Sequence, residues 1–233
     1  MDEVLQDLFA YAFLICGDRG DALRELLGVL RETGLSRDTT ALLSPLTRKL
    51  DRGRADYTIT ILDNLLRADQ TRPLGDREPQ QIRALAWELK RRCLTATLGC
   101  LTPSIRQAFV LCAVMGYSRA EAAEILGISV SALGVRLSRA NRRLDATLAV
   151  RCQHYDRAAP CTCVGRLGTA LNVGFVDAPP PAHDVPAGAH DEDGPIADAR
   201  SIYQKLPRAR LSAEEVAGLI VVASLARPAE IEP

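Results

Sequence analysis

The chain has few aromatic residues, no excess charge of either sign and no long apolar run. Aromatic residues make up 4% of its 233 residues, with a single tryptophan, so helices packed through the abundant Leu and Ala are the natural expectation. No segment is apolar over the roughly 20 residues needed to cross a bilayer. The acidic start, Met1-Asp-Glu-Val-Leu5, lacks the basic stretch of a secretory signal. We therefore expect a cytoplasmic protein without membrane insertion.

Catalytic signals are also scarce. The three histidines all follow residue 150, which leaves few groups for acid–base chemistry. The sequence contains no phosphate-binding glycine loop, no nucleophile elbow and no helix-borne His/Glu metal pair. We therefore predict that the protein is not an enzyme. Lys and Arg together number 29, as do Asp and Glu, so any affinity for nucleic acid must come from local charge.

Helical periodicity dominates the pattern of apolar residues and predicts an all-α fold. Residues 2–33 are expected to form two amphipathic helices that separate near Gly17, and residues 38–67 two more, with Pro45 disturbing the first. Residues 79–98 are expected to form one helix. Another should start at Thr102-Pro103 and run to about Met115.

The predicted architecture is two small helical domains and a loop-rich C-terminal extension. The helical domains cover residues 1–68 and 79–150, joined by a Pro- and Gly-containing linker at 69–78. The extension covers 151–233, with short terminal helices at about 197–206 and 212–226. Its stretch 174–196, rich in Pro and acidic residues, is predicted to be a flexible tether. We hypothesise that its run Asp191-Glu192-Asp193 folds back on a basic helix, so deleting residues 178–196 should tighten DNA binding.

A helix-turn-helix is predicted between residues 118 and 144. Ser118 and Glu121 have the spacing of a capping box, in which each side chain satisfies a free backbone N–H. Ala122 and Ala123 are small enough for another helix to approach closely. Gly127 allows a left-handed turn residue, and Ser129 can cap a second helix.

The second helix is locally basic. Between Ser129 and Arg151 it carries five arginines against one acid, Asp145, while Leu133, Leu137 and Leu144 should face inward. The alternative is an ordinary helical hairpin with a solvated basic face, but the capping box, alanines, glycine and basic helix coincide at the offsets of a DNA reader. The residues left to the outer faces are the candidate DNA-binding set: Ser129, Ser131, Ala132, Val135, Arg136, Ser138, Arg139, Arg142 and Arg143.

Three runs carry a family resemblance: Leu101-Thr-Pro-Ser-Ile-Arg-Gln-Ala-Phe-Val-Leu111, Gly116-Tyr-Ser-Arg-Ala-Glu-Ala-Ala-Glu-Ile-Leu-Gly-Ile-Ser-Val-Ser-Ala-Leu133 and Arg136-Leu-Ser-Arg-Ala140. They closely resemble the C-terminal DNA-binding region of extracytoplasmic-function (ECF) sigma factors, which reads the −35 promoter element. The resemblance covers about residues 79–149. The chain departs from the family at Gly134, where a lysine is usual.

The resemblance implies a sigma factor that directs RNA polymerase core to promoter DNA, with an anti-sigma factor as a further candidate partner. The N-terminal opening, Leu8-Phe-Ala-Tyr-Ala-Phe-Leu14, resembles the family's polymerase-binding and promoter-melting region. No Trp precedes Trp87, however, and Tyr57 is the only aromatic residue between Phe13 and Trp87. Melting needs aromatic surfaces, so we hypothesise that this half binds polymerase weakly or serves another partner. The alternative function is a helix-turn-helix regulator that no longer melts promoters.

A cluster of cysteine and histidine follows the basic helix. Cys152, His154, Cys161 and Cys163 lie in a Cys-x-His-x-Asp-x-x-x-Pro-Cys-x-Cys pattern that resembles an extension found in some of these sigma factors. These donors could bind zinc or copper(I), although we expect that the protein requires no cofactor. The alternative is a loop of thiols, redox-active or inert, with a solvent-facing His. The other cysteines are predicted to be buried small hydrophobes: Cys16, Cys93, Cys100 and Cys112.

Overall fold

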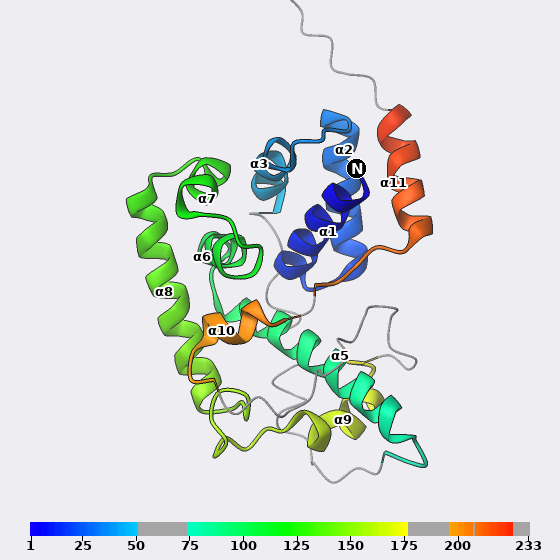
Figure 1. Ribbon diagram of the computed structural model, residues 1–233, viewed down its shortest axis with the longest axis vertical. Coiled ribbons are helices and arrows are strands. Elements are labelled where there is room, and N and C mark those ends of the chain that lie inside the picture. The colour runs from blue at the N-terminus through cyan, green and yellow to red at the C-terminus, as the bar shows by residue number, and fades with distance from the viewer. Residues whose placement is uncertain (51–73, 177–195, 207, 226–233) are drawn as a thin grey trace, which may run out of the picture. The chain divides into compact units, whose positions relative to one another are not determined.

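The structure is a computed structural model that describes residues 1–50, 74–176, 196–206 and 208–225. Every regular element in these ranges is a helix (Figure 1), and the one extended pairing among them is an isolated bridge between Cys152 and Cys161. The all-α prediction is confirmed. None of the helices in the described ranges is both long and apolar enough to span a membrane.

The first two helices begin and end where the sequence predicts. Helix α1 covers Asp2–Cys16 and α2 covers Arg19–Thr33. Gly17 ends α1 with a φ of 75°, a left-handed conformation that glycine adopts without strain. The side chain of Asp18 then accepts a hydrogen bond from the Asp21 N–H and caps α2. The predicted break is therefore confirmed.

Helix α3, Thr39–Leu50, runs through Pro45 without ending. The expected disturbance was wrong, because buried leucines on both sides of the proline hold the helix in place: Leu42, Leu43, Leu46 and Leu50. Packing of this apolar stripe offsets the one hydrogen bond that a proline removes. The second helix expected within 38–67, and the predicted linker up to residue 73, lie outside the described residues.

The stretch before the helix-turn-helix is helical but not uniform. Helix α5 covers Pro79–Thr97 and continues as a short 3-10 turn, η1, at Leu98–Cys100. Helix α6, Pro103–Phe109, starts at the predicted proline and passes into a π-helical turn, η2, at Val110–Val114. The Met115 N–H bonds to the Val110 carbonyl at 2.9 Å. The single α-helix expected to about Met115 therefore widens in its last turn.

The chain forms two compact units that interleave along the sequence. Unit 1 comprises Met1–Arg54, Pro103–Ser138 and Arg208–Pro233, and unit 2 comprises Ala55–Thr102 and Arg139–Pro207. Within unit 1, α1 packs against α2, α3, α6 and η2, and α3 also contacts the first helix of the helix-turn-helix. The largest side chains fully buried in this unit include Phe9, Tyr11 and Phe109. The domain boundaries predicted at residues 68, 78 and 150 remain predictions.

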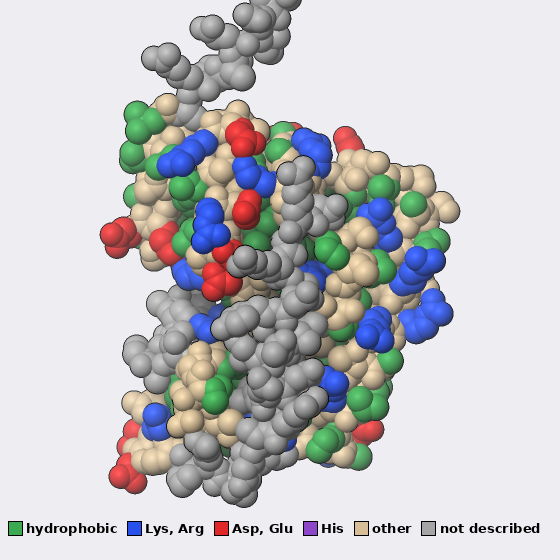
Figure 2. Space-filling view, turned by 180° about the vertical axis from the view of Figure 1, so that it is seen from behind, with side chains coloured by type: hydrophobic (Ala, Val, Ile, Leu, Met, Phe, Trp, Pro, Cys, Tyr) green, Lys and Arg blue, Asp and Glu red, His purple; other side chains and the backbone are tan. Residues whose placement is uncertain are grey.

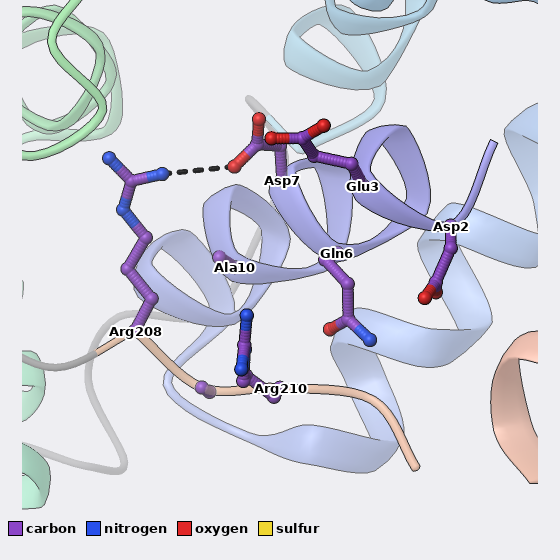
Figure 3. A pocket seen from close by; sticks show the side chains of 8 residues that line it. Asp2, Glu3, Gln6, Asp7, Ala10, Arg208 and Arg210 are labelled. Atoms are coloured by element: carbon purple, nitrogen blue, oxygen red, sulfur yellow. Dashed lines mark hydrogen bonds and ion pairs between the residues drawn. The ribbon is translucent and has the colours of Figure 1, made fainter. Parts of the chain in front are cut away.

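A C-terminal segment completes unit 1. Helix α11, Ala213–Leu225, packs against α2 and confirms the helix expected near 212–226. Before it, the Gln6 amide and the Leu211 backbone exchange two hydrogen bonds, of 3.1 and 2.8 Å. An Arg208 guanidinium nitrogen lies 2.9 Å from an Asp7 carboxylate oxygen, beside a pocket of about 500 Å³ (Figure 3). These contacts hold the segment against α1.

Unit 2 is built on α5. Helix α9, Cys163–Asn172, packs against it, around a core that includes Leu85, Leu89 and Leu167. Helix α10, Ala199–Gln204, confirms the other predicted terminal helix, and its Tyr203 hydroxyl donates to the Leu94 carbonyl at 2.7 Å. Helix α9 was not among the helices that the sequence predicts for the loop-rich extension. Its apolar residues recur at helical spacing, and α5 provides the apolar surface that covers them.

Candidate DNA-binding site

The first helix of the helix-turn-helix, α7, covers Arg119–Leu126 and has the predicted capping box. The Ser118 N–H donates to the Glu121 carboxylate at 2.8 Å, and the Glu121 N–H donates to the Ser118 hydroxyl at 3.2 Å. These hydrogen bonds hold the pKa of Glu121 below its usual value. The capping box therefore stays intact at neutral pH and fixes where α7 begins.

The turn between the two helices follows from Gly127. Its φ of 64° is left-handed, and its N–H bonds to carbonyls in the last turn of α7. Ala122 and Ala123 are buried, and α3 and η2 both pack against α7. The two small side chains thus permit the close helix packing that the sequence predicts.

The second helix, α8, covers Val130–Ala149 as one continuous helix. The Ser129 hydroxyl accepts a hydrogen bond from the Ala132 N–H at 3.1 Å, as expected for its cap. Its inward stripe is Leu133, Ala140, Leu144 and Leu148, all no more than 4% exposed. Leu137, also predicted to face inward, is half-buried.

The predicted DNA-binding residues lie on the opposite side of α8. At about 100° per residue, the eight of them within the helix fall in about 160° of its circumference, and the inward stripe falls in about 80° on the other side. Ala132 and Arg136 are half-buried. The other seven are exposed: Ser129, Ser131, Val135, Ser138, Arg139, Arg142 and Arg143. Whether they contact DNA remains a prediction.

The guanidinium groups of the arginines on this face form no ion pair with the residues that the structure describes. No hydrogen bond joins the guanidinium group of Arg136, Arg139, Arg142 or Arg143 to another described residue, while the backbone carbonyl of Arg143 accepts one from the Thr147 hydroxyl at 2.8 Å. The one acid of α8, Asp145, instead accepts the Ala199 N–H at 2.9 Å. Basic side chains gather along the edge of the molecule where α8 lies, on the right of Figure 2. Such guanidinium groups can bind phosphates or guanine edges without first breaking an ion pair.

Sequence reasoning missed Arg119. This exposed residue is the first of α7, and the first helix of a helix-turn-helix crosses the DNA backbone. Its guanidinium therefore joins the set of candidate phosphate contacts. The signal was present, since a basic residue follows directly after the cap Ser118.

Gly134 lies where the family resembled by this segment usually has a lysine, and substitutions at this position test what the glycine changes. A Cβ built there meets no atom within 4 Å, and the helix gains up to about 1 kcal/mol when glycine becomes alanine. We predict that Gly134→Ala stabilises the protein by about 0.5–1 kcal/mol without changing the salt dependence of DNA binding. Gly134→Lys should add tighter binding with a steeper salt dependence. Thermal unfolding measures the change in stability, and binding titrations at several salt concentrations measure the change in DNA affinity. A Gly134→Ala protein that is less stable than the parent would contradict the finding that a Cβ at this position meets no other atom.

The predicted metal residues lie in unit 2, beyond the end of α8. His154 Nε2 lies 3.4 Å from Cys163 Sγ, and Cys152 pairs with Cys161 in the isolated bridge. All four residues are half-buried. No three His, Cys, Asp or Glu side chains in the described ranges already surround a common point as metal ligands would. Of the cysteines predicted to be buried, only Cys112 is; Cys16, Cys93 and Cys100 are half-buried.

Comparisons with known proteins agree with the geometry of α7 and α8. Residues 91–144 match the family described as Sigma-70, region 4. The RNA polymerase sigma factor CnrH of Cupriavidus metallidurans is 43% identical over 70 residues, which are 30% of this chain and 36% of that protein. The chain thus spans about a third of the length of the relative it matches, and no solved structure matches it. Through these residues the chain is similar to region 4 of sigma factors.

Proposed function

We propose that the protein directs RNA polymerase core to promoters and that α8 reads the −35 element. The observation that carries this proposal is the face of α8, where small or polar residues near its start are followed by exposed arginines that pair with no described residue. A helix face that only meets solvent does not need its small polar residues at the start and its arginines further along. A helix that lies in the major groove needs this order of residues, because its start meets base edges and its flanks meet phosphates.

Each part of this face suits a different contact. Ser129 and Ser131 can reach either base edges or phosphates through their hydroxyls, and Val135 is 50% exposed despite being apolar. An exposed methyl-bearing side chain in the groove can contact the methyl group of thymine. Arg139, Arg142 and Arg143 lie further along the helix, where guanidinium groups would bind guanine edges or flanking phosphates.

The N-terminal helices support the polymerase part of the proposal. Helices α1 and α2 form a packed pair, in the segment that resembles the polymerase-binding region of the family. Their aromatic residues are committed to packing, since Phe9 and Tyr11 are fully buried and Phe13 is 7% exposed. These rings are therefore not free to stack on flipped bases. We propose that α1 and α2 serve mainly to bind polymerase.

Reconstituted transcription tests the proposed function. The full chain is mixed with core polymerase and fragmented genomic DNA, and transcript starts are mapped. We expect starts that depend on the added protein, downstream of a shared −35-like sequence. The matched control, Arg37→Ala, alters an exposed arginine that lies outside α1, α2 and the DNA-binding face, and it should leave the transcripts unchanged. DNA binding without any transcript would contradict the proposal and support the regulator instead.

A further inference from the structure

The C-terminal segment of unit 1, residues 208–225, is held against α1 and α2 by an arginine at the start of α2. The Arg19 guanidinium forms an ion pair with the Glu215 carboxylate, in which Nε lies 3.0 Å from one oxygen and a terminal nitrogen contacts the other. That terminal nitrogen also donates to the Arg210 carbonyl at 3.0 Å. The Arg19 Cζ atom lies 4.9 Å from the centroid of the Phe9 ring on α1. Arg19 therefore joins both helices to the segment.

Two polar side chains of α1 are bonded to the same segment. The Gln6 amide exchanges two hydrogen bonds with the Leu211 backbone. Further along the helix, a guanidinium nitrogen of Arg208 reaches the Asp7 carboxylate, as Figure 3 shows. Polar groups that α1 and α2 could offer to a partner are therefore engaged by the protein's own C-terminal segment.

The apolar part of this contact is small. Three of the 13 residues of α11 are buried, namely Val216, Leu219 and Ala223. On the outer side of the helix, Val221 is 58% exposed and Leu225 is 77% exposed. Because burial of apolar surface is the main force that holds a surface helix in place, α11 is attached by only a narrow stripe.

The ion pairs that fasten the segment are partly open to water. The side chains of the Arg19–Glu215 and Arg208–Asp7 pairs are between 26% and 41% exposed, and such pairs add little to stability. Helices α1, α2 and α3 pack directly against one another, so their shared core does not depend on α11. The segment can therefore leave α1 and α2 while the rest of unit 1 stays folded.

We propose, on the basis of the proposed function in which α1 and α2 bind RNA polymerase core, that residues 208–225 form a displaceable cover over the binding surface. While the cover is in place, Gln6, Asp7 and Arg19 are engaged, and polymerase must displace the segment to reach them. The apparent affinity for polymerase is then reduced by the fraction of molecules whose cover is open. Any change that loosens the cover therefore tightens polymerase binding.

Charge reversal at Glu215 tests the cover in the full-length chain. Glu215→Lys places a second cation beside Arg19 and removes the carboxylate that accepts the Ser212 N–H at 2.7 Å, just before α11. This variant should bind core polymerase at least about fivefold more tightly than the parent. Glu215→Gln loses the ion pair but can keep the capping hydrogen bonds, so its affinity should lie between the two. Biolayer interferometry with immobilised core polymerase measures the affinities.

Glu214→Lys is the matched control. It makes the same charge change one residue earlier, at an exposed position of α11 whose side chain forms no hydrogen bond or ion pair with the residues that the structure describes. It should bind polymerase as the parent does. Thermal unfolding of the three variants checks that the core of α1, α2 and α3 remains folded.

Hydrogen exchange of the parent tests the cover without any substitution. Polymerase binding should slow amide exchange in α1 and α2 and speed it in α11, because the bound polymerase displaces the cover. An α11 that stays protected in the complex would overturn the cover, as would a Glu215→Lys protein with the parent's affinity, and polymerase binding itself would still stand. If neither the parent nor Glu215→Lys binds polymerase, the polymerase part of the proposed function fails, and the cover fails with it.

Discussion

Replacing Arg139 and Arg143 together by alanine should nearly abolish specific promoter binding. The two residues are one helical turn apart, exposed, and paired with no described residue. Loss of one base-edge contact costs about 1–3 kcal/mol, which is about a 5- to 150-fold loss of affinity. If both contact phosphates instead, binding should weaken on all sequences and the salt slope should fall by about two. Fluorescence anisotropy with a promoter duplex at several salt concentrations measures both effects.

The control for this pair is Arg31→Ala, which removes the same side chain from an exposed position on α2. It should bind promoter DNA like the parent at every salt concentration. Thermal unfolding of the double variant should match the parent, because exposed arginines contribute little to stability. Unchanged affinity in the double variant would show that another face of the protein meets the DNA.

Leu133→Ala should destabilise the protein by about 2–5 kcal/mol, whereas Val135→Ala should leave its stability nearly unchanged. The two residues are neighbours on α8, yet Leu133 is fully buried and Val135 is 50% exposed. Truncating the leucine leaves a cavity beneath the turn, and truncating the valine removes only a surface contact. Urea unfolding of both variants measures the difference.

DNA binding should reverse the order of the two variants. At a temperature where both are folded, Val135→Ala should lower the affinity for a promoter that carries a thymine at the contacted step. Leu133→Ala should bind nearly as the parent does, once the folded fraction is taken into account. Equal loss of stability in the two variants would mean that α8 is rotated from the orientation described here.

Local signals in the sequence were sufficient for the helix-turn-helix. Three of its features depend only on residues close in sequence: the capping box at Ser118, the left-handed Gly127 and the cap at Ser129. Such features can be predicted from the sequence alone. The apolar spacing of α8 then decides which side faces inward. Its outward face, including the arginines, follows directly from that spacing.

Features that depend on distant partners could not be predicted in the same way. Pro45 predicts a disturbed helix, yet α3 stays continuous because α1 and α2 pack against its leucines. Helix α9 was missed because its apolar face needs α5, far earlier in the chain. The bonds between Gln6 and Leu211 likewise join residues 205 positions apart.

Methylation interference tests the central claim most directly, because guanine N7 lies in the major groove. A promoter fragment is methylated at guanines, bound by the protein with core polymerase, and the bound and free fractions are compared. We predict interference at guanines of the −35 element, with at least one of these signals lost when Arg139 or Arg143 is alanine. Binding that tolerates methylation throughout that element, or a pattern unchanged by both variants, would contradict an α8 that reads promoter DNA.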